Sequence, residues 1–494
     1  MNLNSVTQIN KIEELFKHSF IYGITSSLQN VLGFIMLPIL TVFYTPEIFG
    51  VYSILLLLSA FSSSIFYLGA SSALGRYYYE IDSKEFRSKI LTTSLVISLV
   101  GACFLIILGY VFSEKISILL FHKTIYSKPI ELMLIGTAFT FLLNLMTLLL
   151  RYDKKSFHFF FIIISGVLIN FLTTYILLSK YKFGLLAPIY GIITSNGVCF
   201  FVIFFSRVKM LTKSLEIHHF KIILNFGIQT SFAGLFFYVL EWVDRLIIKD
   251  FMNLNDVGVY SLGYRLGSVM NFLVIMPFTM VWSPLRMQYA NNSDADVFTG
   301  RVLSYYTLIG VIIIVIAILF GEDFLNLIFV NKSYSSASAI FPIIMFSIFF
   351  WGYQNIVDFG IYLHKKVYIY IIISFIAILI NIFLNLLFIP KWGYLAAAYI
   401  TLFTYFFTST SIYFVSNQYF KIKIEKKRVI LAIITIPILF GVINFFAISE
   451  FSVKVLIASI ILYLFYRFWL NQNEKSHIKN ILCPFLAIKK SKHE

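Results

Sequence analysis

Apolar runs of about 20 residues, separated by short polar connections, recur along the chain from Phe20 to Leu470. A run of this length is what an α-helix needs to cross the roughly 30 Å hydrocarbon core of a bilayer. Turn residues and charges mark where one run ends and the next begins. The pattern predicts an all-α integral membrane protein of about 14 transmembrane helices, near residues 18–43, 47–70, 88–112, 130–150, 157–179, 184–206, 222–248, 257–283, 302–321, 337–361, 367–389, 393–416, 429–448 and 453–470.

The composition agrees with this pattern and excludes a water-soluble fold. Of the 494 residues, 59% are hydrophobic and 13% are charged, which is too little polar surface for a soluble protein of this size. The mainly polar connections reach only about 10 to 20 residues, too short for an extramembrane catalytic or nucleic-acid-binding domain. The chain has no GxxxxGK[ST], HExxH or GxSxG motif and no Cys/His cluster. We therefore expect no enzyme, no ATP-driven pump, no metal site and no bound cofactor.

Basic residues are distributed unevenly between the two sides of the predicted membrane. The net charge is +16, and 28 of the 39 Lys and Arg residues lie in connections that fall on one side. The opposite side holds 9, and Arg245 and Arg265 lie within spans. Positively charged connections stay in the cytoplasm. We therefore predict that both termini are cytoplasmic, and we attribute the basic charge to topology rather than to nucleic-acid binding.

Three pairs of similar strings indicate an internal duplication. Their offsets are 208, 209 and 209 residues, and both members of each pair have the same place within a predicted helix. Six spans return the chain to its starting side, so the two halves have one orientation and a pseudo-twofold axis along the membrane normal is expected. The pairs are GVYS at 50–53 and 258–261, IIIS at 162–165 and 371–374, and KFGLLAPIY at 182–190 with KWGYLAAAY at 391–399.

The duplication predicts three domains: an N-terminal six-helix bundle at 1–206, a second six-helix bundle at 207–420, and two further helices with a cytoplasmic tail at 421–494. Two similar bundles with small extramembrane parts are the architecture of a transporter that rocks its halves about a central cavity. The alternative is that the bundles only scaffold another activity. We expect a transporter.

Charged residues within the predicted spans are few, and most lie in span 222–248. A charge at the bilayer centre costs about 2.5 to 3.5 kcal/mol on insertion scales, so it normally faces a partner or water. Glu241, Asp244 and Arg245 share one helix face, and Arg265 lies on the next span. The positions 208 residues earlier are all uncharged. Two interpretations stay open: an asymmetric, partly cationic cavity for an amphiphile with an anionic head, or an ion-pair network that holds the two spans together.

Two further charged positions carry open alternatives. Asp358 lies on one helix face with Gln354 and close in sequence to Lys365, which fits either an ion-coupling group or an interfacial charge pair. Arg76 follows the span 47–70 at its cytoplasmic end. It either meets a phosphate at the mouth of the cavity or extends its charge to the membrane surface, as long basic side chains commonly do.

The chain resembles a known family in several places. The strings LGFIMLPILTVFYTPEIFGVYSIL at 32–55, LGASSALGRYYYE at 68–80 and EWVDRLIIKDFMNLNDVGVYSLGYRLGSVMNFLVIMPFTMVWSP at 241–284 are similar to the Wzx-type polysaccharide-export flippases of the MOP superfamily. The better markers are the Asp-Arg pair at 244–245, the Gly-x-Tyr-Ser opening of the following span and the Trp-Ser-Pro at its end. The likeness runs in order through most of the first 420 residues.

This resemblance implies a flippase of a bacterial cytoplasmic (inner) membrane. Such proteins move undecaprenyl-pyrophosphate-linked oligosaccharide from the cytoplasmic to the outer leaflet by alternating access, for O-antigen (lipopolysaccharide) or capsule assembly. A polysaccharide polymerase and a chain-length regulator are the protein partners it implies. By position, Arg245, Arg265 and Arg76 are candidate substrate contacts, and Glu241, Asp244 and Asp358 are candidates for ion pairing or for coupling to H+ or Na+. Relatives carry cationic residues in both halves, whereas this first bundle has almost none in mid-span.

Three other functions remain as alternatives. A flippase of the peptidoglycan lipid precursor has the same layout. A MATE-like ion-coupled exporter of cations favours a net acidic cavity, whereas the charges within these spans are mixed. A membrane-embedded polymerase or glycosyltransferase normally needs a large outer loop, and the longest outer loops here, near 113–129 and 322–336, are short.

Overall fold

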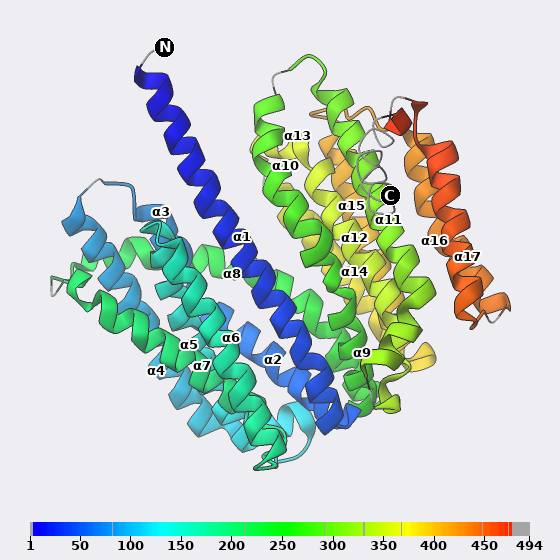
Figure 1. Cartoon of the computed structure of the whole chain (residues 1–494). Helices are drawn as coiled ribbons and strands as arrows, with labels where there is room; N and C mark the ends of the chain where they lie inside the picture. Colours follow the sequence, from blue (N-terminus) through cyan, green and yellow to red (C-terminus); the bar gives the residue numbers. More distant parts are fainter. Residues whose placement is uncertain are drawn as a thin grey trace, which may run out of the picture. The chain divides into compact units, whose positions relative to one another are not determined.

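The computed structural model describes residues 3–476 except positions 82, 213, 291, 330, 367, 447 and 473, and for 3–20, 24, 232–238, 240–241 and 444 it describes the backbone alone. The described part is helical and contains no strand (Figure 1). Its α-helices are α1 Leu3–Phe43, α2 Pro46–Phe66, α3 Ala70–Tyr77, α4 Lys84–Phe121, α5 Ser127–Tyr152, α6 Ser156–Ser179, α7 Leu186–Arg207, α8 Ile217–Phe251, α9 Leu254–Gly267, α10 Met276–Tyr289, α11 Ala295–Ile328, α12 Ala337–Val357, α13 Phe359–Leu363, α14 Tyr368–Trp392, α15 Tyr394–Ser416, α16 Lys426–Phe446 and α17 Phe451–Leu464.

The predicted all-α membrane fold is confirmed, and each of the fourteen predicted spans falls on helical structure. Within the described residues, 12 helices are long and apolar enough to cross a membrane. The two remaining predicted spans, 222–248 and 429–448, correspond to α8 and α16. The predicted span 257–283 is built from two α-helices, α9 and α10, joined through a π-helical segment at Asn271–Ile275.

The helices form two compact units that interleave along the sequence. The first unit contains residues 1–262, 329–336 and 374–400, and the second contains 263–328, 337–373 and 401–494. These units are defined by contacts between helices, whereas the predicted domains 1–206, 207–420 and 421–494 are defined by the sequence repeat. The repeat-based domains stay a prediction.

The backbone repeats itself where the sequence does. Gly184 and Gly393, the equivalent glycines of the third string pair, both have positive φ, at 52° and 68°. Lys154 and Lys365 also have left-handed backbone, at φ 54° and 58°, each at the end of a helix and followed by a second lysine. Because non-glycine residues seldom adopt positive φ, two such lysines at corresponding helix ends support a duplicated architecture.

Close helix packing in the first unit positions α8 against α2 and α3. A Cβ atom on Gly69 would overlap the backbone of Gly227, and a Cβ on Gly227 would overlap the carbonyl oxygen of Leu68. The Ser64 hydroxyl donates a hydrogen bond of 3.4 Å to the Ser231 carbonyl. Small residues at such crossings let helix backbones approach within a membrane. The α8 helix is thereby held by the first half of the chain.

In the second unit, α16 and α17 both pack on α11. The Lys454 amine of α17 lies 2.7 Å from a carboxylate oxygen of Asp323 on α11, and the lysine is only 4% exposed. A lysine buried to this extent needs a charged partner. This ion pair therefore attaches the C-terminal helix to the second unit.

Candidate functional site

A buried carboxylate, Asp244 of α8, is the centre of a polar cluster in the first unit. Its Oδ2 accepts a 2.7 Å hydrogen bond from the Tyr260 hydroxyl of α9, and its Oδ1 accepts a 2.7 Å hydrogen bond from the Asn385 amide of α14. The Asn385 amide also donates to Asn381, one turn earlier on α14, at 2.9 Å. Asp244, Tyr260, Asn381 and Asn385 are all nearly inaccessible to solvent. Three helices thus contribute to one polar site inside an apolar unit.

Arg245, the neighbour of Asp244, also connects α8 to α9, through contacts of its own. Its Nε donates a 3.2 Å hydrogen bond to the Ser261 hydroxyl, and its guanidinium lies 5.7 Å from the centre of the Tyr260 ring. The arginine is only 6% exposed. These contacts support the second interpretation given above, a polar network between α8 and α9, and they leave Arg245 engaged rather than facing open solvent.

One acceptor in this cluster has no hydrogen-bond partner. The Asn385 Oδ1 is fully buried and receives no hydrogen bond, and an unsatisfied buried acceptor costs about 1 to 3 kcal/mol. It belongs to the same amide that donates to Asp244. Amide and carboxylate oxygens are ligands for hard cations, and a carboxylate also accepts a proton. The cluster therefore has the chemistry to hold H+ or a small hard cation such as Na+.

The second unit has its own buried ion pair. The Arg286 guanidinium of α10 donates to a carboxylate oxygen of Asp358 at 2.8 Å, and the Tyr370 hydroxyl donates to the other oxygen at 2.7 Å. The same guanidinium lies 4.1 Å from the centre of the Tyr362 ring. Both members of the pair are buried. Of the two roles considered for Asp358, the charge pair is therefore the one seen, although its partner is Arg286 rather than a nearby lysine.

The remaining predicted residues lie outside these clusters. Arg265 lies near the end of α9 and is exposed. Arg76 of α3 is also exposed, with its guanidinium 5.8 Å from the ring centre of Tyr77. Glu241 lies on α8, and its side chain is outside the described part of the chain. Among the described residues, no group of His, Cys, Asp and Glu side chains is arranged to hold a metal ion.

Several residues of the two clusters were not anticipated from the sequence. Asn381 and Asn385 carried a usable signal, because two asparagines four residues apart on an otherwise apolar span face the same side. The predicted span 257–283 leaves Arg286 outside the helix, whereas α10 continues to Tyr289. Tyr260 and Tyr370 gave no signal, since tyrosine is abundant throughout this chain.

Solved structures of a flippase and of MATE family transporters have a similar fold. The lipid II flippase MurJ, in an inward closed conformation, aligns with 91% of this chain and 98% of its own, at 19% identity and a TM-score of 0.73. A multidrug resistance MATE family transporter of the MOP superfamily in an inward-facing conformation aligns with 79% of this chain and 94% of its own, at 14% identity and a TM-score of 0.66. An outward-facing multidrug resistance MATE family transporter of the MOP superfamily aligns with 82% of this chain and 95% of its own, at 16% identity and a TM-score of 0.56. A comparison with curated proteins finds no significant match.

The chain is thus a multi-pass membrane protein with the helical fold of the MOP superfamily. A sequence model of the family described as polysaccharide biosynthesis protein matches residues 39–339, more than half of the chain. The chain belongs to this family. The resemblance to polysaccharide-export proteins predicted from its sequence is confirmed.

Proposed function

We propose that the protein is a flippase that moves undecaprenyl-pyrophosphate-linked oligosaccharide from the cytoplasmic to the outer leaflet, by alternating access, for the export of O-antigen or capsular polysaccharide. The observation that carries this proposal is the family match over residues 39–339, because that stretch contains the proposed substrate contacts Arg76, Arg245 and Arg265. The duplicated helical architecture supports a transporter rather than an enzyme.

The three arginines have different parts in this proposal. Arg265 and Arg76 are exposed, so their guanidinium groups are available to the pyrophosphate or to acidic sugars, which arginine binds through paired hydrogen bonds. Arg245 is buried against Ser261 and Tyr260. We assign Arg245 to substrate binding as well, as the buried member of the three candidate contacts.

We further propose that Asp244 couples transport to H+ or Na+. Hydrogen bonds from Tyr260 and Asn385 orient the carboxylate, and the unsatisfied Asn385 Oδ1 adds an acceptor to the cluster. Glu241, one turn earlier on α8, is a second candidate for this role. Asp358 is better suited to an ion pair, because the Arg286 guanidinium lies 2.8 Å from its carboxylate and compensates its charge.

A second candidate function is transport of the peptidoglycan lipid precursor. It is favoured by one observation, the alignment of 91% of this chain with the lipid II flippase MurJ. The two candidates differ in the glycan and share the polyprenyl pyrophosphate. The MATE structures raise a third alternative, an ion-coupled exporter, but the mixed charges of the Asp244 and Arg245 region suit an anionic amphiphile better than a cation.

The setting of the proposed activity is a bacterial inner membrane with both termini in the cytoplasm, as the distribution of basic residues predicts. The proposal includes a polysaccharide polymerase and a chain-length regulator as protein partners, because an exported repeat unit has to be polymerised. No nucleic acid and no resident cofactor enter the mechanism.

The test is the leaflet distribution of lipid-linked glycans in inverted vesicles from cells with and without the gene. If undecaprenyl-pyrophosphate-linked oligosaccharide accumulates in the cytoplasmic leaflet when the gene is absent, the proposal holds and the extracted glycan identifies the substrate. Accumulation of the peptidoglycan precursor instead would establish the second candidate. An unchanged glycan distribution together with retention of cationic dyes would replace both with an exporter.

A further inference from the structure

The ends of α1 and α8 are equivalent positions of the repeat, and each makes the same contact within its own half. The Tyr44 hydroxyl, directly after α1, donates a 2.8 Å hydrogen bond to the Gly184 carbonyl. Met252, directly after α8, lies against Gly393, where a Cβ atom would be 3.1 Å from the methionine methyl carbon. Met252 follows Tyr44 by 208 residues, and Gly393 follows Gly184 by 209. The structure therefore repeats here as the sequence does.

The end of α1 is also held by the segment that follows α11, in the other half of the repeat. The Asn331 amide donates hydrogen bonds of 3.4 Å to the carbonyls of Thr41 and Tyr44. The Tyr334 hydroxyl donates a 3.1 Å hydrogen bond to the Tyr44 carbonyl, and its ring centre lies 6.0 Å from that of Phe49. Because the last carbonyls of a helix have no partner within the helix, these side chains complete the end of α1. We call this the α1 contact.

The end of α8 is held in the equivalent way, by the end of α4 in the first half. The Lys249 amine donates a 2.8 Å hydrogen bond to the Leu120 carbonyl, in the last turn of α4. A cation at the carbonyl end of a helix is favoured by the helix dipole. The lysine side chain is only 8% exposed and is paired with Asp250 at 2.6 Å. We call this the α4 contact.

The two contacts are related by the repeat. The helices α4 and α11 correspond to the third predicted span of each half, and α1 and α8 correspond to the first. Each half therefore uses the end of its third span to hold the first span of the other half. Leu120 and Asn331 both fall in the longest predicted outer loops, 113–129 and 322–336. Residues 329–336 pack in the first unit, although α11 and α12 on either side of them belong to the second.

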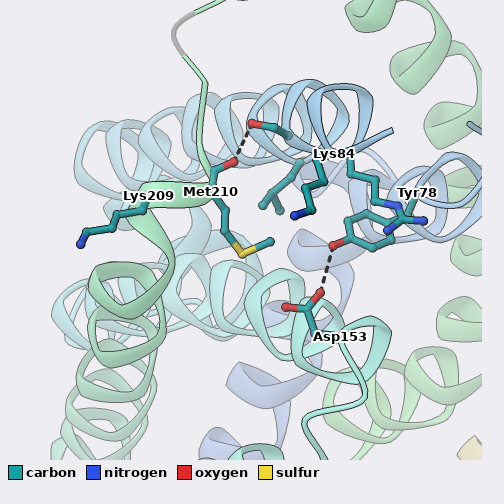
Figure 2. A pocket seen from close by; sticks show the side chains of 8 residues that line it. Tyr78, Lys84, Asp153, Lys209 and Met210 are labelled. Carbon is teal, nitrogen blue, oxygen red and sulfur yellow. Dashed lines mark hydrogen bonds between the residues drawn. The ribbon is translucent and has the colours of Figure 1, made fainter. Parts of the chain in front are cut away.

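A contact at the predicted cytoplasmic end of the first unit is not repeated. Figure 2 shows a cavity there, in which the Tyr78 hydroxyl donates a 3.1 Å hydrogen bond to Asp153. The positions 209 residues later are Met287 and Tyr362, so the second half has no tyrosine and carboxylate pair at the equivalent positions. The duplication alone does not make every contact recur, and the recurrence at the outer ends therefore needs a reason of its own.

We propose that the α1 contact and the α4 contact form a paired latch, which is closed in this structure and whose two parts open together when the protein opens to the outer side. A motion that keeps the pseudo-twofold axis changes both contacts equally, because the axis exchanges them. The latch rests on the alternating access of the proposed function. A hydrogen bond of this kind changes a conformational equilibrium by about fivefold, so a few such bonds are enough to hold one of two conformations.

The experiment is hydrogen exchange of the purified full-length protein, measured at residues 331–336 and at residues 118–123. Tyr334→Phe removes one hydrogen bond of the α1 contact and keeps the ring, and it should accelerate exchange about fivefold in both segments. Lys249→Met removes the charged bond of the α4 contact and should accelerate exchange about tenfold or more, again in both segments. A paired latch requires each variant to act on the segment that it does not touch.

The matched controls remove similar groups that act within one half. Tyr44→Phe removes a buried hydroxyl that donates to the Gly184 carbonyl, and Lys128→Met removes a lysine that pairs with Glu131. Neither should accelerate exchange in either segment, and thermal midpoints show that all four variants fold. Acceleration confined to the altered contact, no acceleration, or equal acceleration by Tyr44→Phe overturns the paired latch.

The exchange measurement needs no substrate, so it separates the latch from the proposed function. Coupled exchange in a protein whose loss leaves lipid-linked glycans unchanged keeps the latch and rejects the flippase. Uncoupled exchange in a protein whose loss traps the glycan in the cytoplasmic leaflet rejects the latch and keeps the flippase.

Discussion

Gly50 of α2 and Gly258 of α9 meet where the two helices cross. A Cβ atom on Gly50 would overlap the carbonyl oxygen of Leu254, and a Cβ on Gly258 would overlap the carbonyl oxygen of Pro46. The two glycines begin the string GVYS in each half and are therefore equivalent positions of the repeat. When two equivalent residues meet, the axis that exchanges the halves passes close to their contact. The pseudo-twofold axis predicted from the repeat would therefore pass near this crossing.

Alanine at either glycine should separate the two helices. Gly50→Ala and Gly258→Ala each force a methyl group into backbone atoms, and overpacking of this kind typically costs about 1 to 3 kcal/mol. The expected result is a lower thermal midpoint in detergent and reduced export. Gly33→Ala is the control, because a Cβ there has no atom within 4 Å. If both crossing variants are as stable as Gly33→Ala, the helices do not approach as described.

Much of the fold was predictable because hydrophobicity, turn residues and the repeat all report on the same spans. The site was less predictable, because a buried polar contact depends on which helix faces are brought together. Asp244 and Arg245 were recognisable as charges in an apolar span. Asn385, which donates a hydrogen bond to Asp244, lies 141 residues later in the chain, and nothing in the sequence links these two residues. The predicted span ends at residue 283, before the charged Arg286. In the structure Arg286 is a buried partner of Asp358 rather than a solvated loop residue, and α10 continues past it.

Asp244→Asn should abolish the dependence of the protein on a coupling ion. Asparagine keeps the size of the side chain and removes the charge, so the ion loses its carboxylate while Tyr260 keeps an acceptor. The wild-type thermal midpoint should rise with Na+, or with falling pH if H+ is the ion, and the variant should show neither response. Asp250→Asn is the control, an exposed carboxylate on the same helix. A variant that retains the full response would exclude Asp244 as the coupling residue.

Arg245→Ala should impair export more than Arg76→Ala. Arg245 is buried against Ser261 and the Tyr260 ring, whereas Arg76 is exposed, and an exposed charge is more easily replaced by a neighbour. Export is measured as surface polysaccharide at matched protein levels. Ser261→Ala removes the hydrogen bond but keeps the arginine. If Ser261→Ala is as defective in export as Arg245→Ala, the arginine acts through packing and not through the substrate. Near-wild-type export from both arginine variants would contradict the proposed substrate site.

Removing one member of the Arg286 and Asp358 pair should destabilise the protein strongly, whereas replacing both members should destabilise it much less. Arg286→Met leaves a buried carboxylate without its cation, and removing one partner of a buried pair costs about 3 to 5 kcal/mol. Replacing both residues, as in Arg286→Met/Asp358→Leu, should recover much of this loss, because no buried charge remains. Thermal unfolding of the wild type, the two single variants and the double variant gives the coupling energy. Additive losses would mean that the two side chains do not interact.

The segment after the last helix should detach in acid. Burial alone would raise the pKa of Glu474, but hydrogen bonds from Arg428 and Tyr305 outweigh burial and lower this pKa below its usual value of 4.5. A carboxyl group whose pKa is lowered by folding stabilises the folded contact above its unfolded pKa, and the stabilisation is lost as the pH falls. Hydrogen exchange of residues 474–476, corrected for intrinsic rates, should therefore accelerate as the pH falls from about 5, near the unfolded pKa, to about 3, through the lower folded pKa. Glu474→Gln, which cannot ionise, should exchange rapidly across this range, and a wild-type segment that stays protected at the lower pH would show that Arg428 does not hold it.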